Sequence, residues 1–174
     1  MIKKETLPYY VLAFALFIGL KIAYRNADNS TLIWLLKPIN YLFSLFTASA
    51  WVYDEEVGFF HASYNIVIDK SCSGGNFFIL SFMMILISWI SIFKKHKSKI
   101  IFILISLCIS YVFTIFVNTS RIIVLFKLQE FQLDSFQWIH EATGSFIYLV
   151  FLILLYLTGF YYQNQKITTY EKSF

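Results

Sequence analysis

Charged residues are scarce in this chain. They make up 14% of its 174 residues, whereas 59% are hydrophobic, and the mean hydropathy is +0.67. A soluble domain usually contains about 25% charged residues, so the polar surface that such a domain needs is lacking. Aromatic residues reach 21%, which is typical of lipid-facing walls and interfacial belts. The composition predicts an integral membrane protein, and the length allows a single domain over residues 1–174.

Basic residues outnumber acidic ones, giving a net charge of +4 and a pI near 9.0. The segment Lys94–Lys99 is almost entirely basic and lies between two apolar runs. Such clusters gather in the cytoplasmic loops of membrane proteins, so this one indicates the orientation of the chain. We therefore expect the lipid bilayer as a partner and no nucleic acid.

No small-residue cleavage site follows the first apolar run, which ends at residues 20–25. We therefore interpret this run as a retained span and not as a cleaved signal peptide. A span needs about 20 predominantly apolar residues, and four stretches meet this requirement. They are residues 8–24, 77–93, 100–117 and 142–162. With the basic loop in the cytoplasm, the chain is a multi-pass protein of the cell membrane whose two termini are cytoplasmic.

Two further stretches are apolar but interrupted. Residues 31–50 contain Pro38, and a proline removes a helical hydrogen bond, so we expect a bent interfacial or re-entrant helix pair there. Residues 119–139 mix charged and apolar side chains, which predicts an amphipathic helix along the outer surface. Residues 65–69 are β-branched in the middle and have turn formers at both ends, which predicts a short extracytoplasmic hairpin. The expected fold is an all-α membrane bundle of about four transmembrane helices.

The chain has two cysteines, which are not expected to form a disulfide. Cys72 lies at the outer end of the second span, whereas Cys108 lies within the third span, about 13 Å deeper. A disulfide needs Cα atoms within about 7 Å of each other. We expect Cys108 to be a small core residue and Cys72 to be a lone thiol at the membrane surface.

Three local features favour a reactive role for Cys72. It immediately precedes a helix, whose N-terminus stabilises a thiolate. The following Ser73-Gly74-Gly75 permits close backbone approach and can present amides to an oxyanion. The thiol also lies at the mouth of a bundle, within reach of a peptide substrate. Cysteines are more often inert, and glycines before a span can serve packing alone, so the motif leaves both interpretations open.

Arg121 comes directly after the third span and three residues after Asn118. One interpretation is a snorkelling arginine that anchors the helix end. On a continuous helix, however, residues three apart share one face. Asn118 and Arg121 would then point at the same spot, which favours a shared cleft.

His140 opens the fourth span, four residues before Gly144. It could simply mark the start of the helix at the interface. A histidine with an ordinary pKa of about 6.5 can also take a thiol proton and return it to a leaving group. His61, in a loop, is the competing candidate for the base. Either Glu55 or Glu141 could orient a histidine.

These residues together resemble the exosortase/archaeosortase family of transpeptidases. Its members carry a Cys-Ser-Gly motif at the start of a span, matched here by Cys72-Ser73-Gly74. They carry an Asn-x-x-Arg motif at the end of the next span, matched here from Asn118 to Arg121.

A histidine opens the last conserved span of the family and is followed by an acidic residue and a glycine. His140, Glu141 and Gly144 match this third motif. The similarity covers residues 65–156, with the three motifs in the family's order. Family members commonly have more spans, so the chain looks like a short form, similar to the subgroup called exosortase K.

The resemblance implies cleavage of a C-terminal sorting signal, which consists of a short motif, a transmembrane helix and basic residues. Cys72 would attack a backbone carbonyl and form a thioester acyl-enzyme, which an acceptor amine or water resolves. His140 would act as general base and acid, and Arg121 would stabilise the thiolate or the oxyanion. The active site would lie on the extracytoplasmic face.

The resemblance also implies positioning roles for Asn118, Ser73 and Gly74, directed at Arg121 or at the substrate. Exported proteins with a transmembrane tail are the expected partners.

Other interpretations compete with this one. A non-enzymatic membrane module, such as a small transporter or assembly subunit, would use Cys72, Arg121 and His140 for packing. A membrane acyltransferase would use His140 and survive the loss of Cys72. A zinc site would need four ligands at short characteristic spacings, which Cys72, His61 and His140 do not show. We therefore expect neither a metal nor another cofactor.

Overall fold

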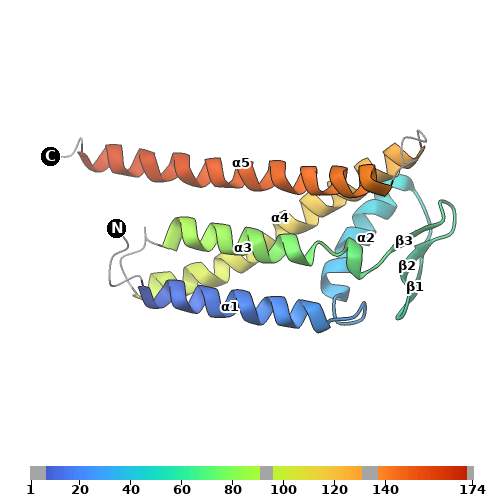
Figure 1. The fold of residues 1–174 in the computed structure, drawn as a ribbon, viewed down its shortest axis with the longest axis horizontal. Coiled ribbons are helices and arrows are strands. Elements are labelled where there is room, and N and C mark those ends of the chain that lie inside the picture. Colours follow the sequence, from blue (N-terminus) through green and yellow to red (C-terminus); the bar gives the residue numbers. More distant parts are fainter. Residues whose placement is uncertain (1–6, 91–95, 131–136, 172–174) are drawn as a thin grey trace.

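The computed structural model describes the backbone of residues 7–90, 96–130 and 137–171, and the side chains within 7–90, 97–129 and 141–161. Helices dominate this part of the chain, and a small sheet lies at one end of the bundle (Figure 1). The elements are α1 (Leu7–Asn26), α2 (Ile33–Thr47), β1 (Val52–Asp54), β2 (Gly58–His61), β3 (Ile66–Ile68), the 3₁₀ turn η2 (Lys70–Cys72), α3 (Gly75–Trp89), α4 (His96–Glu130) and α5 (Gln137–Glu171).

Four helical stretches of the described residues are long and apolar enough to cross a membrane, which confirms the predicted all-α membrane class. They are Leu7–Asn26, Lys70–Trp89, Lys97–Gln129 and Glu141–Tyr161. α3 contacts α1, α4 and α5, so it is the central helix of the bundle. Large apolar side chains are exposed along the outer helices, for example Val11, Leu104 and Leu154, as expected of surfaces that contact lipid.

α4 is longer than the span expected from the sequence. The third span was predicted to end at residue 117 and to be followed by a separate interfacial helix over residues 119–139. Instead, one helix continues without a break to Glu130, while residues 131–136 lie outside the described part. Neither glycine nor proline occurs between residues 96 and 130, so the sequence contains no residue that would end the helix.

α2 is a single helix that contains Pro38, and not the helix pair expected for residues 31–50. Pro38 has no N–H to donate to the carbonyl of Trp34, four residues earlier. The Tyr111 hydroxyl of α4 donates to that carbonyl at 2.8 Å, and the Tyr111 ring stacks on Trp34 at a centroid distance of 5.5 Å. Since this contact satisfies the carbonyl that proline leaves free, the helix continues through position 38.

The predicted hairpin is part of a three-stranded antiparallel sheet with the order β1-β2-β3. Asp54 accepts the N–H groups of Glu56 and Val57 at 2.8 and 3.0 Å and thereby forms the turn between β1 and β2. Buried residues of the sheet, Phe59 and Ile68, pack in one hydrophobic cluster with side chains of α2 and α4. The sheet is therefore fixed to the helices that surround it.

The helix ends are grouped at the two ends of the bundle (Figure 1). α1 and α4 begin, and α3 and α5 end, at the end opposite the sheet. The sheet, η2 and the start of α3 lie at the other end, so the Cys72 segment is on the side of the bundle away from the start of α1 and the end of α5.

Candidate functional site

Cys72 lies in a turn that leads from β3 into α3. The carboxylate of Asp69 caps the turn by accepting the N–H and the hydroxyl of Ser71, at 3.0 and 2.6 Å. The Cys72 N–H donates to the Asp69 carbonyl at 2.9 Å. Gly74 then takes a left-handed conformation with φ of +68°, which glycine adopts without strain. These local bonds hold Cys72 just before the N-terminus of α3.

Polar contacts attach the Cys72 turn to the end of α1. The Lys70 ammonium donates to the carbonyls of Arg25 and Ala27 at 3.0 and 2.7 Å, a favourable pairing of a cation with a helix C-terminus. Asn29, which is nearly buried, accepts the Lys70 N–H at 2.8 Å and donates to the Glu56 carbonyl at 2.9 Å. The loop that follows α1 therefore supports both the turn and the sheet.

Two of the three predicted oxyanion donors in Ser73-Gly74-Gly75 are used inside the turn. The Ser73 N–H donates to the Lys70 carbonyl at 3.1 Å, and the Gly75 N–H donates to the Ser73 hydroxyl oxygen at 3.3 Å. Ser73 is fully buried, and its hydroxyl also pairs with that of Tyr24 at 3.2 Å. Ser73 and Gly74 shape the turn, and a donor from another element would add to what the remaining Gly74 amide can offer an oxyanion at Cys72.

A hydrogen-bonded chain connects Cys72 to α4 and α5. The side-chain amide of Asn118 donates to the Cys72 carbonyl, and its oxygen accepts the Tyr148 hydroxyl. Arg121 Nη1 donates to the Tyr148 oxygen at 3.2 Å, and the guanidinium lies over the Tyr148 ring at 5.1 Å. The prediction that Asn118 and Arg121 share one face is confirmed, since both contact Tyr148.

Asn118 is completely buried, so its amide has no exposed surface for a substrate. It positions the backbone of Cys72 and, through Tyr148, the guanidinium of Arg121. Tyr148 is itself held against α3 by stacking on Phe77, with centroids 4.8 Å apart.

Two glycines allow the Cys72 turn to lie close to Asn118 and α5 to lie close to Arg121. A Cβ atom at Gly74 would lie 2.9 Å from Cγ of Asn118, so a larger residue would separate the Cys72 turn from α4. A Cβ atom at Gly144 would lie 2.6 Å from Nε of Arg121. This Nε is buried and has no hydrogen-bond partner among the described residues. Gly144 therefore provides the space in which the guanidinium lies.

A cleft of about 420 Å³ opens beside the thiol. Its walls come from β3, the Cys72 turn, α4 and the start of α5, and Arg121 is the one basic side chain among the described lining residues. These residues are Ile66, Val67, Ile68, Ser71, Cys72, Arg121, Ile122, Leu125, Phe126, Gln129 and Glu141. The cleft combines apolar walls with a thiol, a cation and a carboxylate, as binding sites commonly do.

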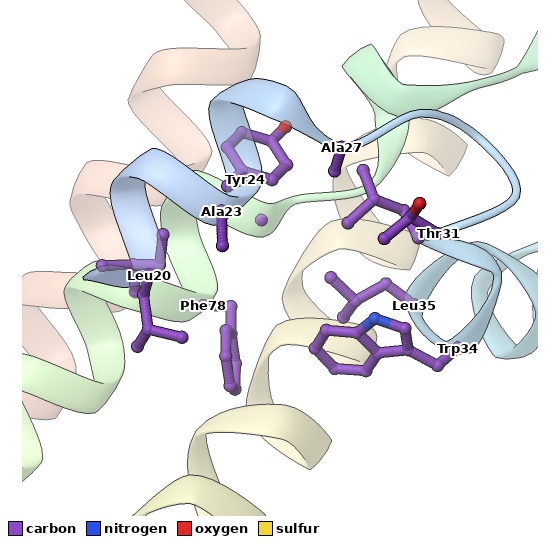
Figure 2. A pocket seen from close by; sticks show the side chains of 11 residues that line it. Leu20, Ala23, Tyr24, Ala27, Thr31, Trp34, Leu35 and Phe78 are labelled. Atoms are coloured by element: carbon purple, nitrogen blue, oxygen red, sulfur yellow. The ribbon is translucent and has the colours of Figure 1, made fainter. Parts of the chain in front are cut away.

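A second, smaller pocket lies between α1, α2 and α3 (Figure 2). Apolar side chains such as Leu20, Leu35 and Phe78 line it, and Tyr24 is its one described titratable residue. The Tyr24 hydroxyl bonds to Ser73 and to the Lys70 carbonyl, so it supports the back of the Cys72 turn. Since neither the thiol nor a charged group is among its lining residues, the larger cleft is the candidate site for the chemistry.

His140 lies in the first turn of α5, four residues before Gly144, and its side chain is outside the described part of the chain. Its neighbour Glu141 lines the Cys72 cleft. Glu55 lies in the exposed turn between β1 and β2 and is not one of the cleft's lining residues. Of the two predicted orienting carboxylates, the structure thus brings Glu141 to the cleft.

His61 is a buried structural residue. Its Nδ1 lies 2.7 Å from the Ser49 hydroxyl and its Nε2 lies 2.7 Å from the Asn40 side-chain oxygen. The ring packs edge-on against Phe43 at 5.0 Å, and the side chain is fully buried. Because both ring nitrogens are bonded within the core, His61 has none left for a substrate at Cys72.

Burial lowers the pKa of His61 below its ordinary value of 6.5, which makes stability depend on pH. The unfolded chain binds a proton at this site more readily than the folded chain, so stability is full above about pH 6.5 and falls as the pH drops below it. We expect the thermal unfolding temperature to decrease between pH 7.5 and 5.5. In His61→Gln this part of the decrease should be missing, while unfolding at pH 7.5 becomes easier by about 1–3 kcal/mol. An equal pH dependence in both proteins would contradict the assignment.

Cys108 is exposed on the outside of α4, so the prediction of a core residue is wrong. It lies among the apolar side chains Ile109, Val112, Phe113 and Phe116. A third span that packs on only one side presents its other face to lipid, and composition alone does not distinguish the two faces, because both are apolar. Both cysteines are free, as predicted.

Tyr148 was not predicted as a site residue. It comes four residues after Gly144 and eight after His140, so the three positions recur on one face of α5. This spacing is the signal that could have found it. Tyrosine is common in this sequence, with 12 copies, and therefore did not stand out.

Comparison with protein families identifies the family of this chain. The family model described as transmembrane exosortase matches residues 6–157, which include Cys72, Asn118, Arg121 and His140. No curated protein and no solved structure matches the chain. The matched region covers most of the sequence, and the chain therefore belongs to the transmembrane exosortase family.

Proposed function

We propose that this chain is a membrane cysteine transpeptidase or protease that cleaves the C-terminal sorting signal of exported proteins through a thioester acyl-enzyme. Membership of the exosortase family supports a membrane transpeptidase role in general. The observation that carries the finer proposal is the shared cleft. Cys72 and Arg121 line it together, and Glu141, the residue after His140, forms part of its wall.

The reaction proceeds in two steps that return the enzyme to its starting state. His140 takes the proton of Cys72, and the sulfur attacks the scissile carbonyl, whose oxygen becomes negatively charged. The C–N bond then breaks, His140 gives the proton to the leaving amine, and a thioester remains on Cys72. An acceptor amine or water attacks the thioester and passes its proton to His140. The C–S bond then breaks, and His140 returns the proton to the departing sulfur of Cys72.

Arg121 stabilises the oxyanion of both tetrahedral intermediates in this mechanism. It is the one basic side chain among the described residues that line the cleft, and the nearby amides of Ser73 and Gly75 are bonded within the turn. A preoriented cation at the position of developing charge stabilises the transition state more than the ground state. Tyr148 and Gly144 hold the guanidinium in place through the contacts described above.

The proposed orientation puts the cleft on the extracytoplasmic face. The sequence that joins α3 to α4 contains Lys94 and Lys95, and these helices meet at the end of the bundle opposite the sheet (Figure 1). The positive-inside rule assigns that end to the cytoplasm. A sorting signal that crosses the membrane would then present its motif at the level of Cys72.

Trapping the acyl-enzyme tests the proposal. Purified full-chain protein in detergent is mixed with a sorting-signal peptide from the same genome, quenched in acid, digested and analysed by mass spectrometry. We expect the fragment with Cys72 to carry the N-terminal part of the peptide and to lose it in hydroxylamine, which cleaves thioesters. Peptide cleavage without a hydroxylamine-sensitive adduct, or an adduct on Cys108, would refute the proposal.

The Gly144→Ala variant is expected to lower the rate of cleavage by about tenfold. The added methyl group would lie 2.6 Å from Arg121 Nε, and the guanidinium, as the flexible end of its side chain, would move away. The thermal unfolding temperature should change little, because the neighbour that yields is not backbone. The rate is measured with the same peptide as above.

Gly19→Ala is the matched control, since a Cβ atom there meets nothing within 4 Å. It also replaces a helical glycine by alanine, and its cleavage rate should equal that of the wild type. If Gly144→Ala were equally active, the position of Arg121 would not matter for the reaction.

A further inference from the structure

The free edge of the sheet forms one wall of the Cys72 cleft. In the described part of the chain, β3 pairs with β2 alone, at the end of the order β1-β2-β3. All three residues of β3 line the cleft together with Cys72. The edge of β3 that β2 does not cover is therefore close to the thiol.

The backbone of Val67 points into the cleft. Cys72 Sγ lies 4.0 Å from the Val67 carbonyl oxygen and is placed as its donor, so this carbonyl points away from β2. In an antiparallel ladder the N–H and C=O groups of one residue point to the same side, and successive residues alternate. Val67 is paired with Phe60 as a non-hydrogen-bonded pair, and its N–H and C=O both face the cleft.

This edge lacks the features that usually protect a strand. Natural edge strands carry charged side chains, prolines or bulges that prevent pairing with another chain. The sequence of β3 is Ile66-Val67-Ile68, which has neither charge nor proline and a high β propensity. Val67 is 37% exposed. A backbone donor and acceptor that β2 does not use thus lie beside the candidate nucleophile.

We infer that the substrate segment around the scissile bond binds as a fourth strand on the free edge of β3. This inference rests on the proposed function, since it names the binding mode of the same substrate. A backbone N–H of the substrate replaces the Cys72 thiol as donor to the Val67 carbonyl, and this exchange frees Sγ next to the substrate backbone. In edge-strand addition, main-chain hydrogen bonds supply affinity, and pockets for every second side chain supply specificity.

The wall of the cleft that α4 provides agrees with this binding mode. Ile122, Leu125 and Phe126 of α4 provide apolar contacts there. Side chains of an extended peptide alternate in direction, so every second side chain would point toward these residues or away from them. The cleft volume of about 420 Å³ lies within the range of about 300–1,000 Å³ that is usual for ligand sites.

The first test compares Val67→Pro with Val67→Ala. Proline removes the N–H that faces the cleft but no bond to β2, and edge strands tolerate proline at such positions. We expect kcat/KM for the sorting-signal peptide to fall at least about tenfold in Val67→Pro and less than about threefold in Val67→Ala, with membrane insertion and abundance unchanged in both. Equal rates in the two variants would overturn the inference.

A second test varies the substrate, so that it stands even if Val67→Pro does not fold. Each backbone amide of the peptide is replaced in turn by an ester, which removes one N–H donor. Since Val67 is the one β3 residue whose carbonyl faces the cleft, strand pairing predicts that the rate falls at the one position whose N–H would donate to this carbonyl and is retained at the two neighbouring positions. A profile without such a single sensitive position would overturn strand addition.

Cys72→Ala separates the failure of this inference from failure of the proposed function. If Cys72→Ala cleaves the peptide at the wild-type rate, the proposed function fails. If Cys72→Ala is inactive while Val67→Pro and the ester series have no effect, strand addition alone fails. Photo-crosslinking from position 67 to a second copy of this chain, and not to the peptide, would assign the edge to dimer contacts and would also overturn the inference.

Discussion

Replacing Cys72 by alanine is expected to lower the rate of sorting-signal cleavage by at least about 10³-fold. In the proposed mechanism the thiol provides the electron pair that forms the acyl-enzyme, and no other described nucleophile of the cleft is placed to do so. Ser71 is the nearest alternative, but its hydroxyl donates to Asp69 at 2.6 Å and helps to form the turn. The measurement is the fraction of a co-expressed sorting-signal reporter that is cut, at equal enzyme abundance.

Cys108→Ala is the matched control for this experiment. Cys108 is the other cysteine of the chain and is exposed on the apolar face of α4. Its replacement should leave both cleavage and membrane insertion unchanged, which excludes a general effect of removing a thiol. Cys72→Ser adds a stricter comparison, because a hydroxyl keeps the shape of the turn but is a weaker nucleophile.

The outcome also separates the proposal from its competitors. A membrane acyltransferase that uses His140 without the thiol would retain its activity in Cys72→Ala. A non-enzymatic module would show no processing of the reporter in any variant, the wild type included. Normal processing by Cys72→Ala would therefore refute a cysteine mechanism.

Much of the architecture was predictable because a bilayer restricts what a sequence can form. Every backbone polar group of a span must be hydrogen-bonded within the protein, so a long apolar run in the sequence predicts a helix. The helical repeat also predicted that Asn118 and Arg121 share a face, and the structure confirms it through their common partner Tyr148. These inferences needed only local spacing.

The features that were not predicted depend on contacts between distant parts of the chain. The continuation of α2 through Pro38 needs the hydroxyl of Tyr111, more than 70 residues away along the chain. The burial of His61 needs Asn40 and Ser49, which come from another element and a loop. Which face of α4 contacts lipid, and hence the exposure of Cys108, depends on how all the helices pack. The spacing of residues along the sequence does not show which distant residues come into contact.

The exclusion of His61 as the base follows from the same kind of contact. In the sequence, both candidate histidines, His61 and His140, are near apolar segments, and either could serve as the base. The structure engages both ring nitrogens of His61 in the core, whereas Glu141, adjacent to His140, lines the cleft. We therefore retain His140 in the proposed mechanism.

Arg121→Gln is expected to lower kcat by about 10²- to 10³-fold with a much smaller change in KM. In the proposed mechanism the guanidinium acts on charge that develops only in the transition state, so its loss should affect the chemical step more than substrate binding. Arg121→Lys should recover little, because an ammonium lacks the planar fork that here bonds to Tyr148 and lies over its ring. Steady-state kinetics with the sorting-signal peptide give both constants.

Tyr148→Phe and Arg25→Gln complete this comparison. Tyr148→Phe keeps the ring under the guanidinium but removes the hydroxyl that bonds to Arg121 and Asn118, and it should lower kcat by about tenfold. Arg25 is an exposed arginine at the end of α1, and its replacement should leave kcat unchanged. A snorkelling anchor at position 121 would behave differently, because Arg121→Gln would then impair membrane insertion and stability while the inserted protein kept the wild-type kcat. A wild-type kcat in correctly inserted Arg121→Gln would therefore contradict a role in stabilising the oxyanion.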